Sequence, residues 1–289
     1  MPSVTEDSEY LLAGEYFLAV QGLAMIRTCV QKPSVARPRV EEIQAIAAHF
    51  ADPPNALSIP MTEYDVGEGY KRWAASYDGP NPAITLEEPI VRELLNEASR
   101  GRALDAACGT GRLVLLLAST GYDVIGVDAS AAMLDIARDK TPSADLRLGQ
   151  LDDLPLPDAA IDLVTCCLAL THVEDLTPVM TEFSRVLRPG GQVILSDMHP
   201  FATMTGAMAA FPGDDITRGI PFVENLTHHV SEYTDAFSAA GLSILRCIEP
   251  RVTDETITTF PSYGLYPDAT RQAFLDTPYL LIWKLNLEH

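Results

Sequence analysis

Short apolar segments alternate with segments of helical period from about residue 85 onward. Apolar runs bounded by turn residues are typical of buried strands, and strands that alternate with helices are typical of a parallel sheet. The sequence therefore predicts an α/β fold: a Rossmann-like, doubly wound, mostly parallel sheet of seven strands with helices on both faces. The expected strands are 103–107, 123–128, 144–148, 161–168, 191–197, 242–249 and 279–286, and the expected helices are 86–98, 112–119, 131–139, 176–188 and 230–240.

The beginning of the sequence has a different pattern, which we interpret as a helical extension. Residues 8–30 lack turn signals and are apolar on most sides of a helix, so this helix must be covered by the protein itself or by a second copy. Pro33 and Pro38 are expected to end it, and 39–50 indicates a second helix. Prolines in 51–60 indicate a linker. The expected division is an extension over 1–60, a core over 61–286 and a purification-tag remnant over 287–289.

Composition limits the partners that the chain can have. There are 40 Asp and Glu side chains against 20 Lys and Arg, a formal net charge of −20, and 47% of the residues are hydrophobic. Nucleic acid and anionic membranes require a positive footprint, so we expect neither as a partner. The longest uncharged apolar stretches, 16–26 and 163–173, are too short to span a bilayer.

The cysteines indicate a reducing compartment. There are five, Cys166 and Cys167 are neighbours, and no C-x-x-C pair occurs. Neighbours on a strand point to opposite faces and make poor disulfide partners. We therefore expect reduced thiols and a cytoplasmic protein, which also fits an acidic start that lacks the basic segment of a signal peptide.

The sharpest local feature is the segment 103–113, where an apolar strand ends in a turn with two glycines and enters a helix. Gly109 and Gly111 let the backbone turn tightly and approach a ligand that a Cβ would exclude. Asp105 ends the first strand, and Asp128 ends the next one. An acid at that second position can accept hydrogen bonds from both hydroxyls of a ribose. The segment therefore predicts a nucleoside-binding turn.

Two nucleoside ligands compete for such a turn. A dinucleotide favours a third glycine for close helix packing, where this chain has Val114, and it needs no acid at Asp105. A carboxylate just before the turn suits a ligand that has a cationic ammonium group and no pyrophosphate. S-Adenosylmethionine is such a ligand, so the residues favour the methyl donor.

Five motifs follow one another at a spacing that is specific when they are taken together. They are Asp105-x-x-x-Gly109-x-Gly111, Asp128, the segment 154–164 (LPLPDAAIDLV), Ala169-Leu170-Thr171-His172 and Leu187-Arg188-Pro189-Gly190-Gly191. On these motifs the chain resembles the class I S-adenosylmethionine-dependent methyltransferases of the bacterial small-molecule type, over about residues 64–286. The resemblance implies S-adenosylmethionine as the cofactor and S-adenosylhomocysteine as the product.

Carried over residue by residue, the resemblance implies a donor site. Asp105 and the backbone of Ala107, Gly109 and Gly111 would face the methionine part of the donor, and Asp128 would face its ribose.

The adenine would lie further along the same edge. Ala129 or Met133 would line its pocket, and the backbone N–H of Leu151 would serve a ring nitrogen. Where the family commonly has an aspartate, this chain has Gln150, which can accept from the adenine amino group through its neutral amide oxygen.

Aromatic residues upstream of the core resemble the segment that precedes it in these enzymes. Tyr70, Trp73 and Tyr77 recur on one face of a helix, and they either dock that helix on the core or close over the donor, where aromatic faces favour the sulfonium charge. A carbonyl near Cys167 or Leu168 would meet the donor's ammonium.

Three residues are candidates for acid–base work, which is needed only if the acceptor must lose a proton. They are His172, Asp197 and His199, which follow or end the fourth and fifth strands. The alternatives are that His172 only caps the next helix and that His199 belongs to a structural turn. His228 and His229 are expected at the surface of a helix start.

We expect no catalytic metal. The catechol-type magnesium site of some relatives has an acid at the end of the fourth strand, where this chain has Cys-Cys-Leu. The pairs Asp152-Asp153 and Asp214-Asp215 are interpreted as solvated acids.

A long connection over 198–229 is interpreted as a lid that binds the acceptor, without a clear strand of its own. Its apolar residues favour a hydrophobic or aromatic acceptor over a charged one. They are Phe201, Met204, Met208, Phe211, Pro221 and Phe222.

We therefore expect an enzyme that transfers a methyl group to an O, N or C atom of a small, largely apolar metabolite in secondary (natural-product) metabolism. One alternative is a protein of this fold that catalyses a non-methylating reaction, such as a cyclisation, with the donor as a structural cofactor. Another is a donor-binding partner subunit whose residues 8–30 form a homo-oligomer interface. A dehydrogenase ranks last.

Overall fold

The computed structural model describes residues 10–98, 100–212 and 219–288. The acidic residues near the start, the middle of the expected lid with Asp214-Asp215, and His289 lie outside the described residues. The chain divides into two compact units. The large unit consists of Tyr64–Phe211, Val223–Pro250 and Pro278–His289, and the small unit consists of Met1–Glu63, Pro212–Phe222 and Arg251–Thr277.

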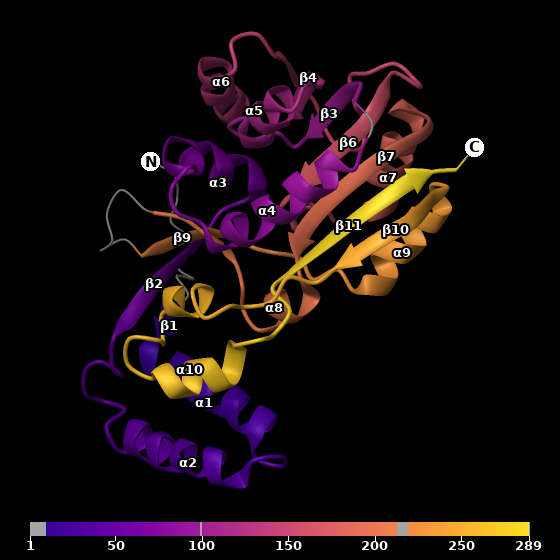
Figure 1. The fold of residues 1–289 in the computed structure, drawn as a ribbon. Coiled ribbons are helices and arrows are strands. Elements are labelled where there is room, and N and C mark those ends of the chain that lie inside the picture. The colour runs from indigo at the N-terminus through magenta and orange to yellow at the C-terminus, as the bar shows by residue number, and fades with distance from the viewer. Residues whose placement is uncertain (1–9, 99, 213–218, 289) are drawn as a thin grey trace. The chain divides into compact units, whose positions relative to one another are not determined.

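The large unit is built on a seven-stranded sheet with the order β10-β11-β7-β6-β3-β4-β5 (Figure 1). The strands β3 to β7 are parallel, and β11 is antiparallel to both of its neighbours, β7 and β10. This arrangement confirms the predicted α/β sheet. The strands are β3 (Arg102–Ala106), β4 (Asp123–Asp128), β5 (Asp145–Leu148), β6 (Ile161–Cys167), β7 (Leu187–Met198), β10 (Leu242–Ile248) and β11 (Leu280–Leu287), with a short β8 (Ala209–Ala210) outside the sheet.

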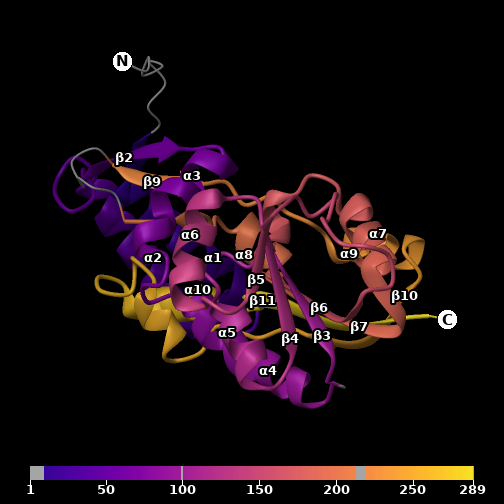
Figure 2. The ribbon, with the colours of Figure 1, turned by 90° about the horizontal axis from the view of Figure 1, so that it is seen from above.

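Helices cover both faces of this sheet. Figure 2 shows α4 and α5 on one face and α7 and α9 on the other. Buried side chains such as Leu94 and Leu117 fill the first layer, and Phe183, Phe237 and Trp283 fill the second. The helices are α3 (Val66–Trp73), α4 (Pro82–Asn96), α5 (Arg112–Ser119), α6 (Ala131–Lys140), α7 (Leu176–Val186), α8 (Pro200–Met204) and α9 (Val230–Ala239), with 3-10 turns η1 (Ala74–Ser76) and η2 (Leu170–His172).

Polar side chains fix where several helices begin. Asn81 accepts from the N–H of Ala83 and starts α4 four residues earlier than the sequence predicts. Ser130 caps α6 in the same way. Asp175 caps α7 by accepting from the N–H of Thr177. Such caps satisfy N–H groups that have no partner within the helix.

The small unit gathers three stretches of the chain. Phe17 of α1 lies 5.1 Å from the Tyr266 ring, between ring centroids, and Arg27 donates to the carbonyls of Gln272 and Ala273 at the end of α10. Its elements are β1 (Tyr10–Leu12), α1 (Ala13–Thr28), α2 (Pro33–Ala48), β2 (Ser58–Glu63), β9 (Ile220–Val223, of which Val223 is in the large unit), η4 (Thr256–Thr259) and α10 (Pro267–Phe274).

Four details of the predicted extension were wrong. The stretch 8–30 contains a strand before its helix, and Pro33 starts α2, because a proline at the first helical position loses no needed N–H. Pro38 lies inside α2, which continues past it. The expected linker ends as strand β2, which pairs in parallel with β9. The stretch 198–229, expected to lack strands, thus contains β9.

Candidate active site

The sheet brings the predicted donor residues to one edge. β3 lies between β4 and β6, and β6 pairs with β7, so the carboxyl ends of these four parallel strands meet. Asp105 lies near the end of β3, Asp128 ends β4, and Asp197 lies near the end of β7. Open α/β sheets bind ligands at this edge.

The glycine turn needs both of its glycines. Gly109 and Gly111 have φ values of +53° and +86°, in the left-handed region. A Cβ on Gly111 would also lie 3.2 Å from the Cβ of Ala137 on α6. The N–H of Cys108 donates to the carbonyl of Val127 at 2.9 Å, which ties the turn to β4.

Two residues other than glycine share this backbone conformation at the same edge. Ala107 after β3 has a φ of +59°, and Leu168 after β6 has a φ of +57°. Each costs on the order of 1–3 kcal/mol and persists where its surroundings fix it. The N–H of Leu168 donates to the carbonyl of Ser196 at 2.8 Å, which holds this turn against β7. Strained backbone of this kind often accompanies a binding site.

Asp128 braces the glycine turn. Its Oδ2 accepts from the N–H of Gly109 and its Oδ1 from the N–H of Ser130, each at 2.8 Å. Burial raises the pKa of Asp128, although these two hydrogen bonds oppose the rise. Each carboxylate oxygen has two lone pairs, so each can accept a further hydrogen bond from a hydroxyl group.

Asp105 is a buried acid with a free acceptor. Its Oδ1 accepts from Thr165 Oγ1 at 2.9 Å, whereas its Oδ2 is buried without a hydrogen-bond partner. Burial raises the pKa of Asp105 to about 7, against the opposing effect of the Thr165 hydrogen bond. A buried polar atom without a partner is costly, and a cationic ammonium would supply the partner. The residues present therefore fit the amino-acid end of S-adenosylmethionine.

The three predicted aromatic residues form a row next to the glycine turn. The ring centroids of Tyr70 and Trp73 lie 5.6 Å apart, those of Trp73 and Tyr77 lie 5.0 Å apart, and Phe211 stacks on Trp73 at 5.3 Å. The Tyr77 ring approaches to 3.9 Å of the position that a Cβ on Gly109 would take. The aromatic row, Tyr70, Trp73 and Tyr77, thus lies beside the site as well as packing the helix.

His172 is held in one tautomer. Its Nδ1 lies 3.0 Å from the carbonyl oxygen of Glu224, and its Nε2 lies 2.7 Å from the hydroxyl of Tyr70. A carbonyl can only accept, so Nδ1 carries the proton and Nε2 accepts from Tyr70. Burial lowers the pKa of His172 and keeps the ring neutral. Asp175, not His172, caps the following helix.

The other two acid–base candidates have structural partners. Asp197 is buried, and its carboxylate accepts from the N–H of Met198 and the hydroxyl of Tyr233. The Nδ1 of His199 accepts from the N–H of Phe201 at the start of α8, and its Nε2 donates to Glu249. Both ring nitrogens of His199 are therefore engaged.

The remaining candidates lie along the same edge with different exposures. Met133 is buried, Leu151, Cys167 and Leu168 are half-buried, and Ala129 and Gln150 are exposed. His228, expected at the surface, is instead buried, because its Nε2 donates to the carbonyl of Val173 and its ring packs edge-on to Tyr233. His229 is exposed, as predicted.

Comparison with known proteins finds a family model that matches the residues around this edge of the sheet. Residues 104–195 match the family model described as a methyltransferase domain, and that range holds Asp105, the glycine turn, Asp128 and His172. Over these residues the chain is similar to methyltransferases, and its sheet has the fold of the S-adenosylmethionine-dependent ones.

The similarity to curated relatives covers part of this chain and part of theirs. A malonyl-[acyl-carrier protein] O-methyltransferase from Serratia marcescens is 34% identical over 136 residues, which are 46% of this chain and 52% of that protein. The chain thus spans about half the length of this curated relative.

Solved structures support the fold. An S-adenosylmethionine dependent methyltransferase from Mesorhizobium loti is similar with a TM-score of 0.52 and 24% identity, over 70% of this chain and 97% of that one. The [4+2]-cyclase SpnF is similar with a TM-score of 0.55 and 17% identity, over 79% and 98% of the two chains. At such identities the similarity concerns the fold alone.

The large unit also contains two charged clusters that the sequence analysis missed. Glu87 of α4 is fully buried and pairs with Arg112, the first residue of α5. Asp78 accepts from Thr110 Oγ1 at 2.7 Å within the glycine turn and pairs with Lys140 at the end of α6. Two features of the sequence could have revealed these clusters: the arginine directly after Gly111 and the acid directly after Tyr77.

Within the described ranges, no three His, Cys, Asp or Glu side chains gather in a way that could hold a metal ion. No helix in the same ranges is both long and apolar enough to cross a bilayer. The absence of a catalytic metal stays an expectation.

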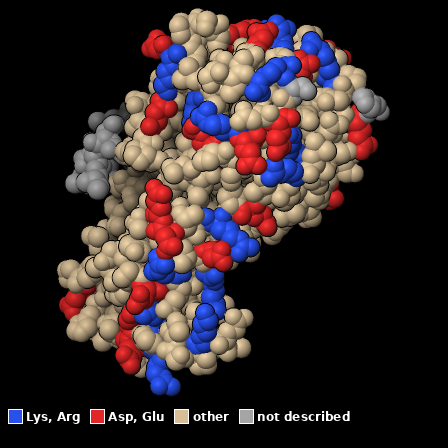
Figure 3. All heavy atoms as spheres, viewed as in Figure 1, with Lys and Arg blue, Asp and Glu red and all other residues tan. Residues whose placement is uncertain are grey.

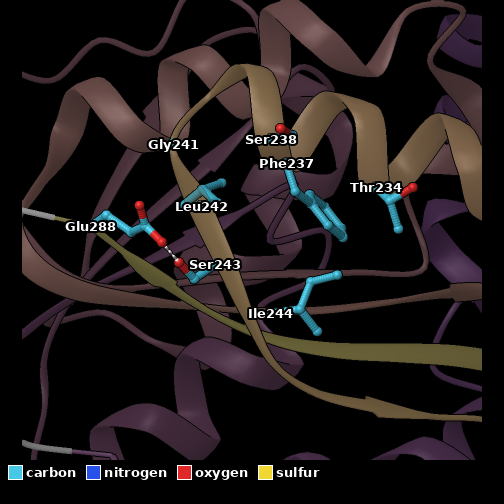
Figure 4. A pocket seen from close by; sticks show the side chains of 8 residues that line it. All are labelled: Thr234, Phe237, Ser238, Gly241, Leu242, Ser243, Ile244 and Glu288. Atoms are coloured by element: carbon cyan, nitrogen blue, oxygen red, sulfur yellow. Dashed lines mark hydrogen bonds between the residues drawn. The ribbon is translucent and has the colours of Figure 1, made fainter.

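The surface of the described residues has mixed charges and a hollow next to β10. Figure 3 shows basic and acidic side chains interspersed over the face that it presents, without a continuous basic area. A hollow of about 270 Å³ lies where α9 ends and β10 begins, at the amino-terminal edge of the sheet, away from the glycine turn (Figure 4). Its lining includes Phe237, Ile244 and Glu288.

Proposed function

We propose that this chain is an enzyme that transfers the methyl group of S-adenosylmethionine to an O, N or C atom of a small, largely apolar molecule. The observation that carries the proposal is the buried, unpaired Oδ2 of Asp105 beside a glycine turn that Asp128 braces. The methyltransferase domain in the same residues supports it.

The site residues would bind and align the donor, which supplies an electrophilic methyl group on a sulfonium. Asp105 would accept from the ammonium, helped by a carbonyl near Cys167 or Leu168, and Asp128 would accept from the ribose. The adenine would lie near Ala129, Met133, Gln150 and Leu151. Alignment and exclusion of water are the main demands of an in-line displacement.

The aromatic row would serve the sulfonium. Aromatic faces attract a nearby cation by about 0.5–2 kcal/mol, depending on how far the site is desolvated. Trp73 and Tyr77 lie next to the glycine turn and so could present such faces to the donor.

His172 is the residue that we propose as the base for an acceptor that must lose a proton. Its Nδ1–H is fixed by Glu224, so the lone pair of Nε2 is available once Tyr70 gives way to the acceptor. Asp197 and His199 are better explained as groups that support β7 and α8, since their polar atoms are engaged.

The residues proposed to face the methyl acceptor favour an apolar molecule. Phe211 stacks on the aromatic row, and Met204 and Met208 are exposed by 68% and 41%. Flexible methionines adapt to irregular apolar ligands. A role in secondary metabolism, a cytoplasmic location and a homo-oligomer through residues 8–30 remain part of this proposal.

Binding of S-adenosylhomocysteine tests the donor site. Titration calorimetry should give a dissociation constant of about 10 μM or tighter. Asp128→Ala should weaken binding about 10–100-fold, because it removes the ribose acceptor and the brace of Gly109. Asp128→Asn, which keeps one acceptor oxygen, should lose less. Wild-type affinity in Asp128→Ala would show that the donor binds elsewhere.

A screen with isotopically labelled donor tests the reaction. Aromatic, polyketide, terpenoid and peptide acceptors are incubated with enzyme, and mass spectrometry follows the gain of a labelled methyl group. A product that forms without label, and only in the presence of the donor, would indicate a non-methylating reaction such as a cyclisation instead.

A further inference from the structure

Arg112 is fixed at the carboxyl edge of the sheet by a buried acid. It is the first residue of α5, directly after Gly111, and its Nη2 pairs with Oε2 of Glu87. The other oxygen of Glu87 accepts from Ser196 Oγ on β7. Glu87 is fully buried, so the guanidinium is held by a carboxylate that α4 and β7 keep in place. Its direction is therefore set before any ligand arrives.

One nitrogen of this guanidinium has no hydrogen-bond partner. Arg112 Nη1 is buried without a hydrogen-bond partner, and its ion pair with the carboxylate of Glu88, at 4.0 Å, is beyond hydrogen-bond distance. Buried N–H groups are nearly always paired in folded proteins. A nitrogen without a hydrogen-bond partner beside the glycine turn can donate to an acceptor that comes with the ligand.

Asp105 and Arg112 form a pair of opposite charges that fits an amino acid. Among the charges that act on Asp105, Arg112 is the cation, and Asp128 and Glu87 are acids. In an α-amino acid the ammonium nitrogen and the carboxyl carbon are only about 2.5 Å apart, since one carbon joins them. A ligand whose ammonium meets Asp105 must therefore bring its carboxylate into surroundings with three acids, where it needs a cation.

We propose that Arg112 binds the carboxylate of the donor's methionine part through Nη1, and that Glu87 is the residue that positions it. This assignment rests on the proposed function, because it extends the contact between Asp105 and the donor's ammonium. Its consequence is selectivity: the site requires both charges of the amino acid, so nucleosides that lack either charge bind weakly.

The competing arrangement places the carboxylate on backbone N–H groups. The start of α5 carries unpaired N–H groups and a positive dipole, which also attract anions. In that case the Arg112 side chain only supports the turn. The two arrangements differ in whether loss of the guanidinium affects a ligand that has no carboxylate.

Calorimetry with three ligands distinguishes the binding of the carboxylate by Arg112 from its binding by backbone N–H groups. The ligands are S-adenosylhomocysteine, its decarboxylated analogue S-adenosyl-3-thiopropylamine, and 5′-methylthioadenosine, which lacks the amino acid. The test variant is Arg112→Met combined with Glu87→Gln, so that no buried carboxylate is left unpaired. Glu87→Gln alone and Arg92→Met, an exposed arginine of α4, are the controls, and circular dichroism checks that each variant is folded.

The double variant should bind S-adenosylhomocysteine about 10–100-fold more weakly than Glu87→Gln does, and should bind the decarboxylated analogue within about twofold. Asp105→Asn should instead weaken both amine-bearing ligands and leave 5′-methylthioadenosine unchanged. Equal losses for S-adenosylhomocysteine and its decarboxylated analogue, or no loss for either, would overturn the role of Arg112. If the wild type binds none of the three ligands, the proposed function fails together with this assignment.

Discussion

Asp105 and Asp197 are both buried acids with raised pKa values, but their partners differ. Burial raises the pKa of Asp105 to about 7 and that of Asp197 to about 6. Asp197 has donors on both oxygens, from Met198 and Tyr233, whereas Asp105 has Thr165 on one oxygen and nothing on the other. Similar burial thus leaves one acid with both oxygens hydrogen-bonded and the other with an acceptor oxygen that has no hydrogen-bond partner.

Affinity for S-adenosylhomocysteine should depend on pH through Asp105. In the proposed donor site the ammonium binds the ionised carboxylate, so protonation of Asp105 would compete with the ligand. With a pKa of about 7, lowering the pH from 7.5 to 5.5 reduces the ionised fraction, and with it the affinity, by about twentyfold. Calorimetry across this range measures the slope.

Two variants control this pH dependence. Asp105→Asn should bind more weakly at pH 7.5 and show a nearly flat profile. Asp197→Asn should keep the slope of the wild type, because Asp197 faces Tyr233 and Met198. A slope that survives in Asp105→Asn would assign the titration to another group.

The sequence predicted the conformation of the glycine turn well, because backbone geometry leaves few choices there. The turn at Gly109 and Gly111, with Asp105 and Asp128 at strand ends, follows from local spacing alone. Glu87 and Arg112 were missed because charges on helices usually face solvent, and their burial depends on how α4 and α5 pack. The partner of His172 could not be predicted either, since Tyr70 comes from a helix 102 residues earlier.

The segment that carries the aromatic row is fastened to the glycine turn by one aspartate. Asp78 accepts from Thr110 Oγ1 and pairs with Lys140, so it joins the end of this segment to both the turn and α6. Burial opposes its ionisation, but hydrogen bonds from Lys140 and Thr110 outweigh burial and lower the pKa of Asp78. The Asp78 carboxylate is therefore charged at neutral pH.

Loosening this connection should speed the release of ligand. In Lys140→Met, S-adenosylhomocysteine should dissociate about 5–10-fold faster, because Asp78 loses an ion pair that holds this segment, including the neighbouring Tyr77 beside Gly109, against α6. Stopped-flow fluorescence of Trp73 follows the release. Arg138→Met, on the same helix and paired with Asp135, is the matched control.

Salt provides an independent check of the same connection. Half-exposed ion pairs are screened by salt, so release from the wild type should become faster as salt is added, while Lys140→Met should respond less. Identical release rates in Lys140→Met and the wild type would mean that Asp78 has no part in holding the segment.

Regular elements of the sheet were predictable, and elements that depend on distant partners were not. β4 and α5 have the predicted bounds, because their apolar patterns are unbroken. β9 contains Pro221 and only four residues, and it exists through its pairing with β2 from far upstream. α2 continues past Pro38, where sequence rules favour a break.

The small unit is assembled from parts that are far apart in the chain. α1 packs against α10, and Arg27 satisfies carbonyls at the end of α10 that have no partner within the helix. Phe17 and Tyr266 contact each other across the same interface. Neither helix therefore covers its apolar side without the other.

Removing residues 1–57 should leave α10 without its partner. The truncated chain should bind a hydrophobic dye and aggregate in light scattering, because the apolar side of α10 becomes exposed. Replacing 251–277 as well by a short Gly/Ser linker should reduce both effects. A short linker can join the two ends that this deletion leaves, since the N–H of Tyr279 donates to the carbonyl of Pro250 at 2.8 Å. A truncated chain that stays monodisperse and binds no dye would contradict this packing.

The position of β11 has a consequence for synthesis of the protein. Among the strands that the structure describes, β11 is the last in chain order, yet it lies between β7 and β10. A growing chain on the ribosome thus exposes one side of β7 until residues 280–287 have emerged, and an open strand edge is a template for pairing with other chains. The sheet is completed only after about ninety residues have been made beyond β7, so a chaperone that shields this edge during translation should raise the yield of folded protein.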